Sequence, residues 1–304
     1  MRDPYLFILL VRLGIVAALA SILARSEFFK NILLKETRPL NQRIQLAFVL
    51  APIFAAGVAT RVITRGYDAV DFGLEASMIS GMVGGYVSGL LAGSLIAIPG
   101  MLNGEYLSLP LLAGVGALGG LVRNVAHDPE QVWRFTPFVL LNLSRILSPR
   151  HDHKQTSFQM FFLGAVVWAE FLRQALGSFV GRKGIFYLAP PQPVEHPLIT
   201  VATYAATLFV VFLPIKIWAS SRNERKLEEQ KRLLVEARLQ ALSSQINPHF
   251  LFNTLNSVSS LIRTDPDLAR TVVFKLSRIL RGLLKKSKDF SPLRDEVAFV
   301  DDYL

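Results

Sequence analysis

The chain has 304 residues, of which 51% are hydrophobic and 18% are charged. This apolar content excludes a disordered chain, and the absence of cysteine excludes a disulfide scaffold, a Cys-based metal site and thiol catalysis. Residues 1–218 carry 18 Lys or Arg and 12 Asp or Glu, whereas the shorter stretch 219–304 carries 15 and 11. The net charge of +10 is therefore spread over both parts, which argues against direct nucleic-acid binding. The composition predicts a membrane domain followed by a charged, helical tail.

Six apolar stretches approach the length of about 20 residues that a helix needs to cross a bilayer. They cover residues 6–24, 44–63, 76–98, 107–122, 158–176 and 198–218. The first stretch is not a signal peptide, because no cleavage pattern follows it and further spans do. We therefore expect an all-α, polytopic membrane bundle of about six spans.

The third stretch repeats glycine every four residues, at Gly81, Gly85, Gly89 and Gly93. On a helix this spacing makes one face of small side chains, along which a second helix can approach closely. We expect tight helix packing here, with a backbone that lines a ligand cavity as the alternative.

The distribution of basic residues gives a partial prediction of topology. The loop between the fourth and fifth spans and the tail after Trp218 are rich in Lys and Arg, so both are expected in the cytoplasm. The loop around Asn103 and Glu105 lacks basic residues and is expected outside. The loop after the first span contradicts this scheme, since it is basic and would lie outside. We expect a multi-pass protein with both ends inside.

Ionisable residues inside membrane spans are costly and are therefore candidates for function. Arg12 lies in the first span, Arg61 near the end of the second, and Glu170 in the fifth. We take these three as sensor candidates. Arg61 is expected to snorkel to the interface, and Arg12 is expected to pair with Glu170, with a ligand contact as the alternative for Arg12.

The tail begins with a stretch that predicts one long helix. Leu227, Leu234 and Ala241 recur every seven residues between charged side chains, and no Gly or Pro occurs between Pro214 and Pro248. Residues 219–244 are expected to form a signalling coiled coil that carries a movement of the last span onward, although a solvated helical linker fits the pattern equally well.

The next segment predicts two amphipathic helices. Polar residues recur at helical spacing along the first helix, at Gln245, His249, Asn253, Asn256 and Ser260. An apolar stripe runs beside them and continues on the second helix, at Ile246, Leu251, Leu255, Val258, Ile262, Leu268, Val272, Leu276, Ile279 and Leu283. Asp265 and Pro266 provide an N-cap and a first helical residue between the two. A hairpin cannot bury both stripes alone, so we expect a symmetric dimer with His249 on its surface.

The run Gln245-Ile-Asn-Pro-His-Phe-Leu-Phe-Asn-Thr-Leu-Asn256 resembles the phosphoacceptor segment of LytS-type sensor histidine kinases. The later runs Ile-Arg-Thr-Asp-Pro-Asp-Leu-Ala-Arg and Leu-Ser-Arg-Ile-Leu-Arg resemble the second helix of that family. Val11-Arg12-Leu-Gly, Phe28-Phe29-Lys30-Asn31 and the glycine-rich third span resemble its multi-span sensor region. The resemblance implies a homodimer in which His249 takes the γ-phosphoryl group of ATP.

The resemblance also implies roles for the residues around His249. Asn253, one turn on, would orient the ring or the incoming phosphate, and the motif is completed by Gln245, Asn247, Pro248 and Asn256. Many other histidine kinases have an acid directly after the histidine, but Phe250 stands there in this chain. The general base is therefore not identified by the sequence.

ATP and Mg²⁺ are the implied cofactors, and in this family they are bound by a C-terminal ATP-binding domain. No phosphate-binding loop or acidic Mg²⁺ cluster occurs before Leu304. We expect that the chain is a fragment, with phosphate supply by another protein as the alternative. His127, His151 and His153 are better explained as a solvated loop than as a metal site, so no metal centre is predicted.

The sequence thus predicts a sensor histidine kinase of the bacterial inner membrane. A membrane sensor domain (1–218) would be followed by a coiled coil (219–244) and by a dimerisation and phosphoacceptor region (245–304). The expected partner is a response regulator, commonly of the LytTR type in this family, and the signal is an unknown small molecule or a state of the cell envelope. A small-solute membrane carrier with a dimerising tail and a non-catalytic receptor are the alternatives.

Overall fold

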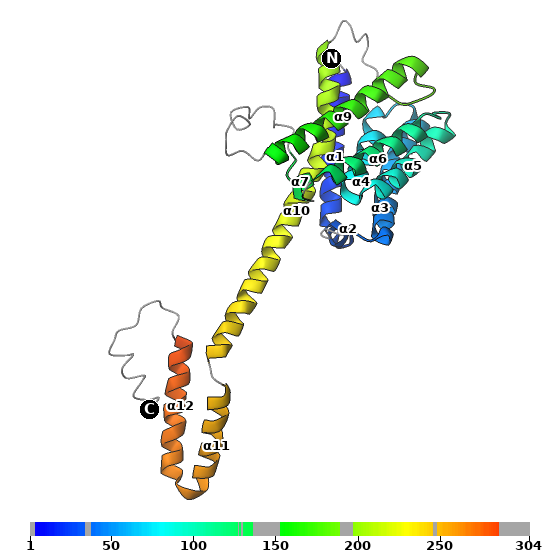
Figure 1. The fold of residues 1–304 in the computed structure, drawn as a ribbon. Coiled ribbons are helices and arrows are strands. Elements are labelled where there is room, and N and C mark those ends of the chain that lie inside the picture. The colour runs from blue at the N-terminus through cyan, green and yellow to red at the C-terminus, as the bar shows by residue number, and fades with distance from the viewer. Residues whose placement is uncertain are drawn as a thin grey trace. The chain divides into compact units, whose positions relative to one another are not determined.

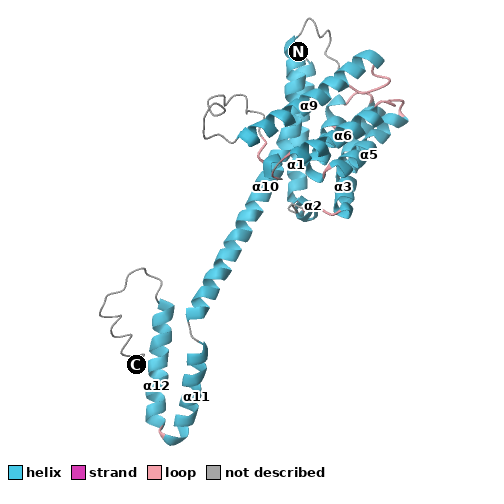
Figure 2. Cartoon of the chain, viewed as in Figure 1, coloured by secondary structure: helices cyan, strands magenta, loops and turns pink. Residues whose placement is uncertain are grey.

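The computed structural model describes residues 4–33, 38–126, 128, 130–135, 153–188, 197–245 and 248–285. Within these ranges the regular elements are all helices, and no strand occurs (Figures 1 and 2). The expected all-α class is therefore confirmed. Chain contacts divide the protein into two compact units, Met1–Glu224 and Arg225–Leu304. The functional division at residues 218 and 244 stays a prediction.

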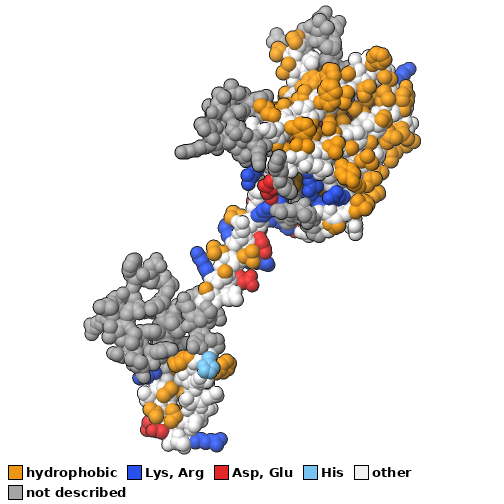
Figure 3. All heavy atoms as spheres, in the orientation of Figure 1, with side chains coloured by type: hydrophobic (Ala, Val, Ile, Leu, Met, Phe, Trp, Pro, Cys, Tyr) orange, Lys and Arg blue, Asp and Glu red, His pale blue; other side chains and the backbone are white. Residues whose placement is uncertain are grey.

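The first unit contains ten helical elements in the described ranges (Figure 1). They are α1 (Pro4–Arg25), α2 (Glu27–Leu33), α3 (Leu40–Thr64), the 3-10 helix η1 (Asp68–Val70), α4 (Gly73–Gly84), α5 (Tyr86–Leu102), α6 (Ser108–Val125), α7 (Glu130–Trp133), α9 (His153–Val180) and the first part of α10 (Pro197–Gln245). Among the described residues, α1, α3, α6, α9 and α10 are long and apolar enough to cross a membrane. Apolar side chains cover most of the visible face of this unit (Figure 3), as expected for a membrane protein.

The third predicted span, residues 76–98, is wrong as a single helix. α4 ends at Gly84 and α5 begins at Tyr86, with Gly85 between them at φ 89° and ψ 175°. Glycine adopts such a positive φ without the steric penalty of a side chain. The apolar run continues unbroken across this point, so hydropathy alone concealed the break. The expected six spans are thus five long helices and a pair of shorter ones.

The expectation that both ends lie inside is wrong, because α1 and the membrane part of α10 run in the same direction. Tyr5 packs with Ile199 near the start of both helices, and Ala20 contacts Trp218 near their other ends.

Glycine does mediate close packing of α4 and α5 on α6, as predicted from the repeat. A Cβ atom on Gly81 or on Gly89 would overlap the carbonyl oxygen of Gly116, and one on Gly93 would overlap that of Leu112. Three of the four repeated glycines therefore lie against the backbone of α6. The fourth, Gly85, forms the break instead.

The membrane part of α10 is anchored in the core of the first unit. The Trp218 indole is 1% exposed, donates a hydrogen bond from Nε1 to the Ala20 carbonyl at 3.0 Å, and contacts the Phe29 ring at a centroid distance of 4.9 Å. α10 then continues without interruption to Gln245, which confirms the predicted long helix. Leu227 and Leu234, which belong to the seven-residue repeat, are each 52% exposed in the single chain.

The second unit ends in a hairpin of α11 (Pro248–Thr264) and α12 (Pro266–Lys285). Asp265 caps α12 as predicted, because its Oδ1 accepts a hydrogen bond from the Leu268 amide at 3.0 Å. The hairpin buries Val258, Ala269 and Leu276. Leu268 was predicted on the buried side but is 47% exposed in the single chain, since it lies in the first turn of α12 beside the connection. The side chains of Ile279 and Leu283 lie outside the described residues, as does Ile246.

Candidate functional site

His249 is presented to solvent in the first turn of α11. It directly follows Pro248, which begins the helix, and its side chain is exposed. The amide nitrogen of Asn253, one turn further on, lies 3.2 Å from Nδ1 and 3.4 Å from Nε2 of the imidazole. The amide therefore lies beside both ring nitrogens, and a phosphoryl oxygen that approached either of them would meet this hydrogen-bond donor.

The remaining motif residues are only partly described. Asn256 is exposed on α11, whereas Asn247 lies outside the described residues, as do the side chains of Gln245 and Pro248. Thr254 and Ser257 donate their hydroxyl groups to backbone carbonyls within the helix, to those of Phe250 at 2.8 Å and Asn253 at 3.0 Å. Among the motif side chains that the structure describes, the imidazole and the amides of Asn253 and Asn256 face solvent.

The hairpin carries an apolar groove of about 580 Å³ beside its buried residues. Val258, Ile262, Ala269, Val273 and Phe274 are among the residues that line it. Phe274 is 71% exposed and Ile262 is 59% exposed. Exposed apolar side chains of this size, gathered along one groove, are typical of a surface that another chain covers.

A second candidate site lies inside the first unit, where Arg12 of α1 is 1% exposed. Its Nη2 lies 2.8 Å from Glu75 Oε1 of α4, and its Nη1 donates to the Asp71 carbonyl at 2.6 Å. The predicted pairing of Arg12 with Glu170 is therefore wrong. Hydropathy identifies a charge inside a span, but it does not say which neighbouring helix supplies the opposite charge.

Glu170 of α9 is nevertheless linked to Arg12 through two further residues. Its Oε2 lies 2.5 Å from Nη2 of Arg173, one turn along the same helix, and that nitrogen lies 3.5 Å from Oε1 of Glu75. Glu170 also accepts a hydrogen bond from Thr207 of α10 at 3.2 Å. The chain of contacts Arg12–Glu75–Arg173–Glu170, here called the buried ion chain, thus joins α1, α4 and α9, and the Thr207 hydroxyl links it to α10.

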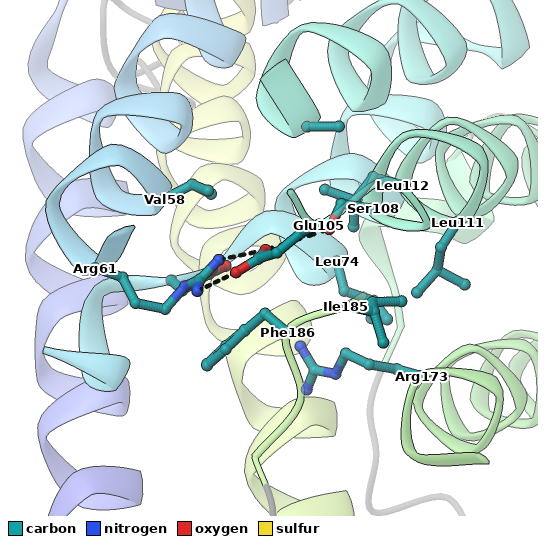
Figure 4. Close-up of a pocket in the computed structure, with 12 residues that line it drawn as sticks. Val58, Arg61, Leu74, Glu105, Ser108, Leu111, Leu112, Arg173, Ile185 and Phe186 are labelled. Atoms are coloured by element: carbon teal, nitrogen blue, oxygen red, sulfur yellow. Dashed lines mark hydrogen bonds and ion pairs between the residues drawn. The ribbon is translucent and has the colours of Figure 1, made fainter. Parts of the chain in front are cut away.

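Arg61 does not snorkel to the interface, and that prediction is wrong. Its Nε lies 2.6 Å from Asp71 Oδ2, and its Nη1 and Nη2 donate to the two Glu105 oxygens at 2.6 and 2.7 Å. The guanidinium carbon also lies 4.1 Å from the centre of the Phe186 ring. Figure 4 shows Arg61 and Glu105 facing each other, with Phe186 and Arg173 near them. Paired in this way, Arg61 is only 8% exposed.

The Arg61–Glu105 pair borders two spaces. A small cavity of about 20 Å³, enough for about one water molecule, is lined by both residues and by Asp71, Arg173 and Phe186. A larger, open hollow of about 740 Å³ shares Arg61, Glu105 and Phe186 with it. The pair therefore stands between an open surface hollow and the interior that holds the buried ion chain.

Four residues of these networks were missed by the sequence reasoning. Arg173 lies inside the predicted fifth span, so the same search that found Glu170 was able to find it. Asp71, Glu75 and Glu105 lie just outside predicted spans, where charged residues are expected to be solvated. Only the packed helices show that these three carboxylates turn inward, and all are 5% exposed or less. His127 and His151, considered above for metal binding, lie outside the described residues.

Comparison with known proteins identifies the C-terminal segment. Residues 237–304 match the family model described as Histidine kinase. Over these residues the chain resembles the LytS-type sensor histidine kinases. The sensor histidine kinase BtsS of Escherichia coli (strain K12) is 42% identical over 77 residues, which are 25% of this chain and 14% of that protein. YpdA of the same organism, also a sensor histidine kinase, is 42% identical over 80 residues, 26% of this chain and 14% of that protein.

A third relative is the sensor protein LytS of Oceanobacillus iheyensis, which is 44% identical over 78 residues, 25% of this chain and 13% of that protein. The matched segment thus spans about one seventh of the length of these relatives. No solved structure matches the chain. The segment that matches contains His249, Asn253 and the whole α11–α12 hairpin.

Proposed function

We propose that the protein is a membrane sensor histidine kinase of a two-component system, in which His249 is the phosphoacceptor. The observation that supports this most directly is the exposed imidazole in the first turn of α11, with the Asn253 amide 3.2 Å away, inside the segment that matches the histidine kinase family. The membrane unit would receive the signal, and α10 would carry it to the hairpin. The chain would lie in the bacterial inner membrane with its C-terminal tail in the cytoplasm.

The proposed chemistry needs little covalent machinery from this chain. The lone pair of one imidazole nitrogen attacks the γ-phosphorus of ATP, the bond from that phosphorus to the bridging oxygen breaks, and ADP leaves with the electron pair. Mg²⁺ neutralises charge on the phosphates, and positioning provides most of the remaining rate. Asn253 would donate to a phosphoryl oxygen or hold the ring. The ATP-binding domain that the family carries would supply ATP and Mg²⁺.

The second transfer would regenerate the histidine. A carboxylate oxygen of an Asp in the response regulator attacks the phosphorus of phosphohistidine, the P–N bond breaks, and the imidazole nitrogen recovers its lone pair. Exposure of His249 suits this step, because two different protein surfaces must reach the same nitrogen in turn. By resemblance, the regulator is of the LytTR type.

Phosphorylation of the full chain tests this proposal. The purified chain in detergent is incubated with Mg-ATP and with the ATP-binding domain of a LytS-type relative supplied in trans. We expect a label that is stable to base and lost in acid, as a phosphoramidate is. His249→Gln should abolish the label and leave the helical circular dichroism unchanged.

Two further variants separate chemistry from folding. Asn253→Ala removes the amide beside the ring and should slow labelling by up to about tenfold, the value of one hydrogen bond in the transition state. Ser260→Ala alters an exposed residue two to three turns further along the same polar stripe and should label at the normal rate. A label that survives His249→Gln would move the phosphoacceptor to another residue and end this proposal.

A further inference from the structure

Four arginines come together at one end of the first unit, near its last residue, Glu224. We call Arg38, Arg43, Arg123 and Arg222 the arginine cluster. Arg38 and Arg43 lie before and within the first turn of α3, Arg123 lies in the last turn of α6, and Arg222 lies on α10. Three separate parts of the chain therefore bring the four guanidinium groups to the same place.

The contacts of these arginines show how close they lie to one another. Nη1 of Arg123 and Nη1 of Arg43 are 3.5 and 3.6 Å from the point at which a Cβ atom on Gly85 would stand. Arg38 is 6% exposed and donates from Nη1 to the Val83 carbonyl at 2.6 Å, two residues before that glycine. Arg43 in turn donates from Nε to the Arg38 carbonyl at 3.0 Å. Arg38, Arg43 and Arg123 thus lie around the break between α4 and α5.

The arginines of the cluster influence one another electrostatically. Burial and the neighbouring charges of Arg123, Arg222 and Arg43 lower the pKa of the Arg38 guanidinium to about 10. Among the described residues, Glu130 of α7 contributes a carboxylate, which lies 2.6 Å from Nη1 of Arg222.

The break adds a second feature that favours an anion. α5 begins beside the cluster, so the amide groups and the positive end of its helix dipole lie near Arg43 and Arg123. Because Gly85 has no side chain, the guanidinium groups of Arg43 and Arg123 can lie close to the backbone there.

We propose that the arginine cluster binds a phosphate group at the membrane surface. Arginine presents a planar fork of donors that matches the oxygens of phosphate, and basic pockets between membrane helices on the cytoplasmic side bind lipid headgroups in this way. The phosphate comes either from the headgroup of an anionic phospholipid or from a free anion. This site is separate from the kinase chemistry proposed above and does not depend on it.

A titration of the full chain in neutral detergent tests the site. Short-chain phosphatidylglycerol, matched phosphatidylcholine and inorganic phosphate are added separately, and thermal unfolding is followed at each concentration. We expect phosphatidylglycerol to raise the unfolding temperature. In the double variant Arg43→Gln, Arg123→Gln, the concentration that gives half of this effect should increase at least about tenfold, since two charge-assisted hydrogen bonds are lost.

The control is Arg65→Gln, Lys183→Gln, which removes the same charge from two exposed residues that line the open hollow beside Arg61 and should leave the midpoint unchanged. An effect of phosphatidylglycerol alone assigns the site to lipid, and competition by inorganic phosphate assigns it to a free anion. Equal midpoints in the wild type and the cluster variant would overturn the proposal, and so would a wild type that responds to none of the anions. If the glutamine variant does not fold, Arg43→Lys, Arg123→Lys keeps the charge but loses the fork, and an unchanged midpoint there overturns it too.

Discussion

Arg12, Glu75, Arg173 and Glu170 alternate in charge along the buried ion chain. Each of these side chains is at most 2% exposed, so water cannot compensate for the loss of a neighbour. Removal of one member of a buried ion pair leaves an unpaired charge and typically costs about 3–5 kcal/mol. Replacing the partner of a charged residue should therefore cost more stability at these positions than at an exposed ion pair.

Charge exchange tests which carboxylate holds Arg12. Arg12→Glu places two carboxylates together and should lower the unfolding free energy by at least about 3 kcal/mol. Adding Glu75→Arg should restore part of the expression and of the unfolding temperature in detergent, because it re-forms the ion pair at 2.8 Å but places the new arginine beside Arg173. Adding Glu170→Arg instead serves as the matched control and should restore neither. Recovery in the Glu170 combination alone would contradict the observed pairing.

At the scale of elements, α6 is the helix against which α4 and α5 pack without intervening side chains. Gly116 lies opposite Gly81 and Gly89, so the backbones meet where a methyl group would overlap a carbonyl. Gly114, two residues earlier on the same helix, has no atom within 4 Å of its Cβ position. The two glycines lie on the same helix, but Gly116 is packed against another backbone and Gly114 faces open space.

This contrast gives a prediction with an internal control. Gly116→Ala should destabilise the membrane unit by about 1–3 kcal/mol, because the added methyl group forces the helices apart. Gly114→Ala adds the same group in open space and should be neutral, or stabilising by up to about 1 kcal/mol through helix propensity. Thermal unfolding of the two variants in one detergent compares them directly. Equal loss in both would show that α6 does not pack through Gly116.

At the scale of the whole molecule, the groove of the α11–α12 hairpin is the surface on which we expect a second copy to pack. Val273 and Phe274 leave large apolar areas exposed beside the buried Ala269. A symmetric dimer would cover this groove in both copies and build a four-helix bundle. The exposed His249 would then remain on the outer surface, as the proposed chemistry requires.

The absence of native cysteine makes this dimer testable in the intact membrane. Ile262→Cys, Val273→Cys and Phe274→Cys are introduced singly, and membranes are treated with a mild oxidant. At least one of these variants should yield a disulfide-linked dimer, since a shared interface brings Cβ atoms within about 4 Å of each other. Ser260→Cys, on the polar stripe, is the control and should remain monomeric. Cross-linking no stronger in the groove variants than in this control would contradict the dimer.

The sequence alone predicted the helices and caps that depend on residues nearby in the chain. It missed the features that depend on how distant helices pack against one another. The cap at Asp265 and the uninterrupted α10 follow from nearby residues, and both are present. The break at Gly85 lies inside a continuous apolar run, and its φ of 89° is a backbone property that hydropathy does not report. The pairing of Arg12 with Glu75 rather than Glu170 is set by how α1, α4 and α9 pack. The role of His249 still depends on the experiment above.

Because α10 is one uninterrupted helix, the number of its residues determines the direction in which its later side chains point. Each residue turns an α-helix by about 100°, and seven residues return it to within about 20° of its starting direction. One residue inserted between Glu224 and Gln245 would rotate the helical residues after it by more than a quarter turn. An insertion of seven residues would return side chains such as Leu227 and Leu234 nearly to their original direction. The number of residues in α10 therefore fixes the direction in which the side chains at its far end point.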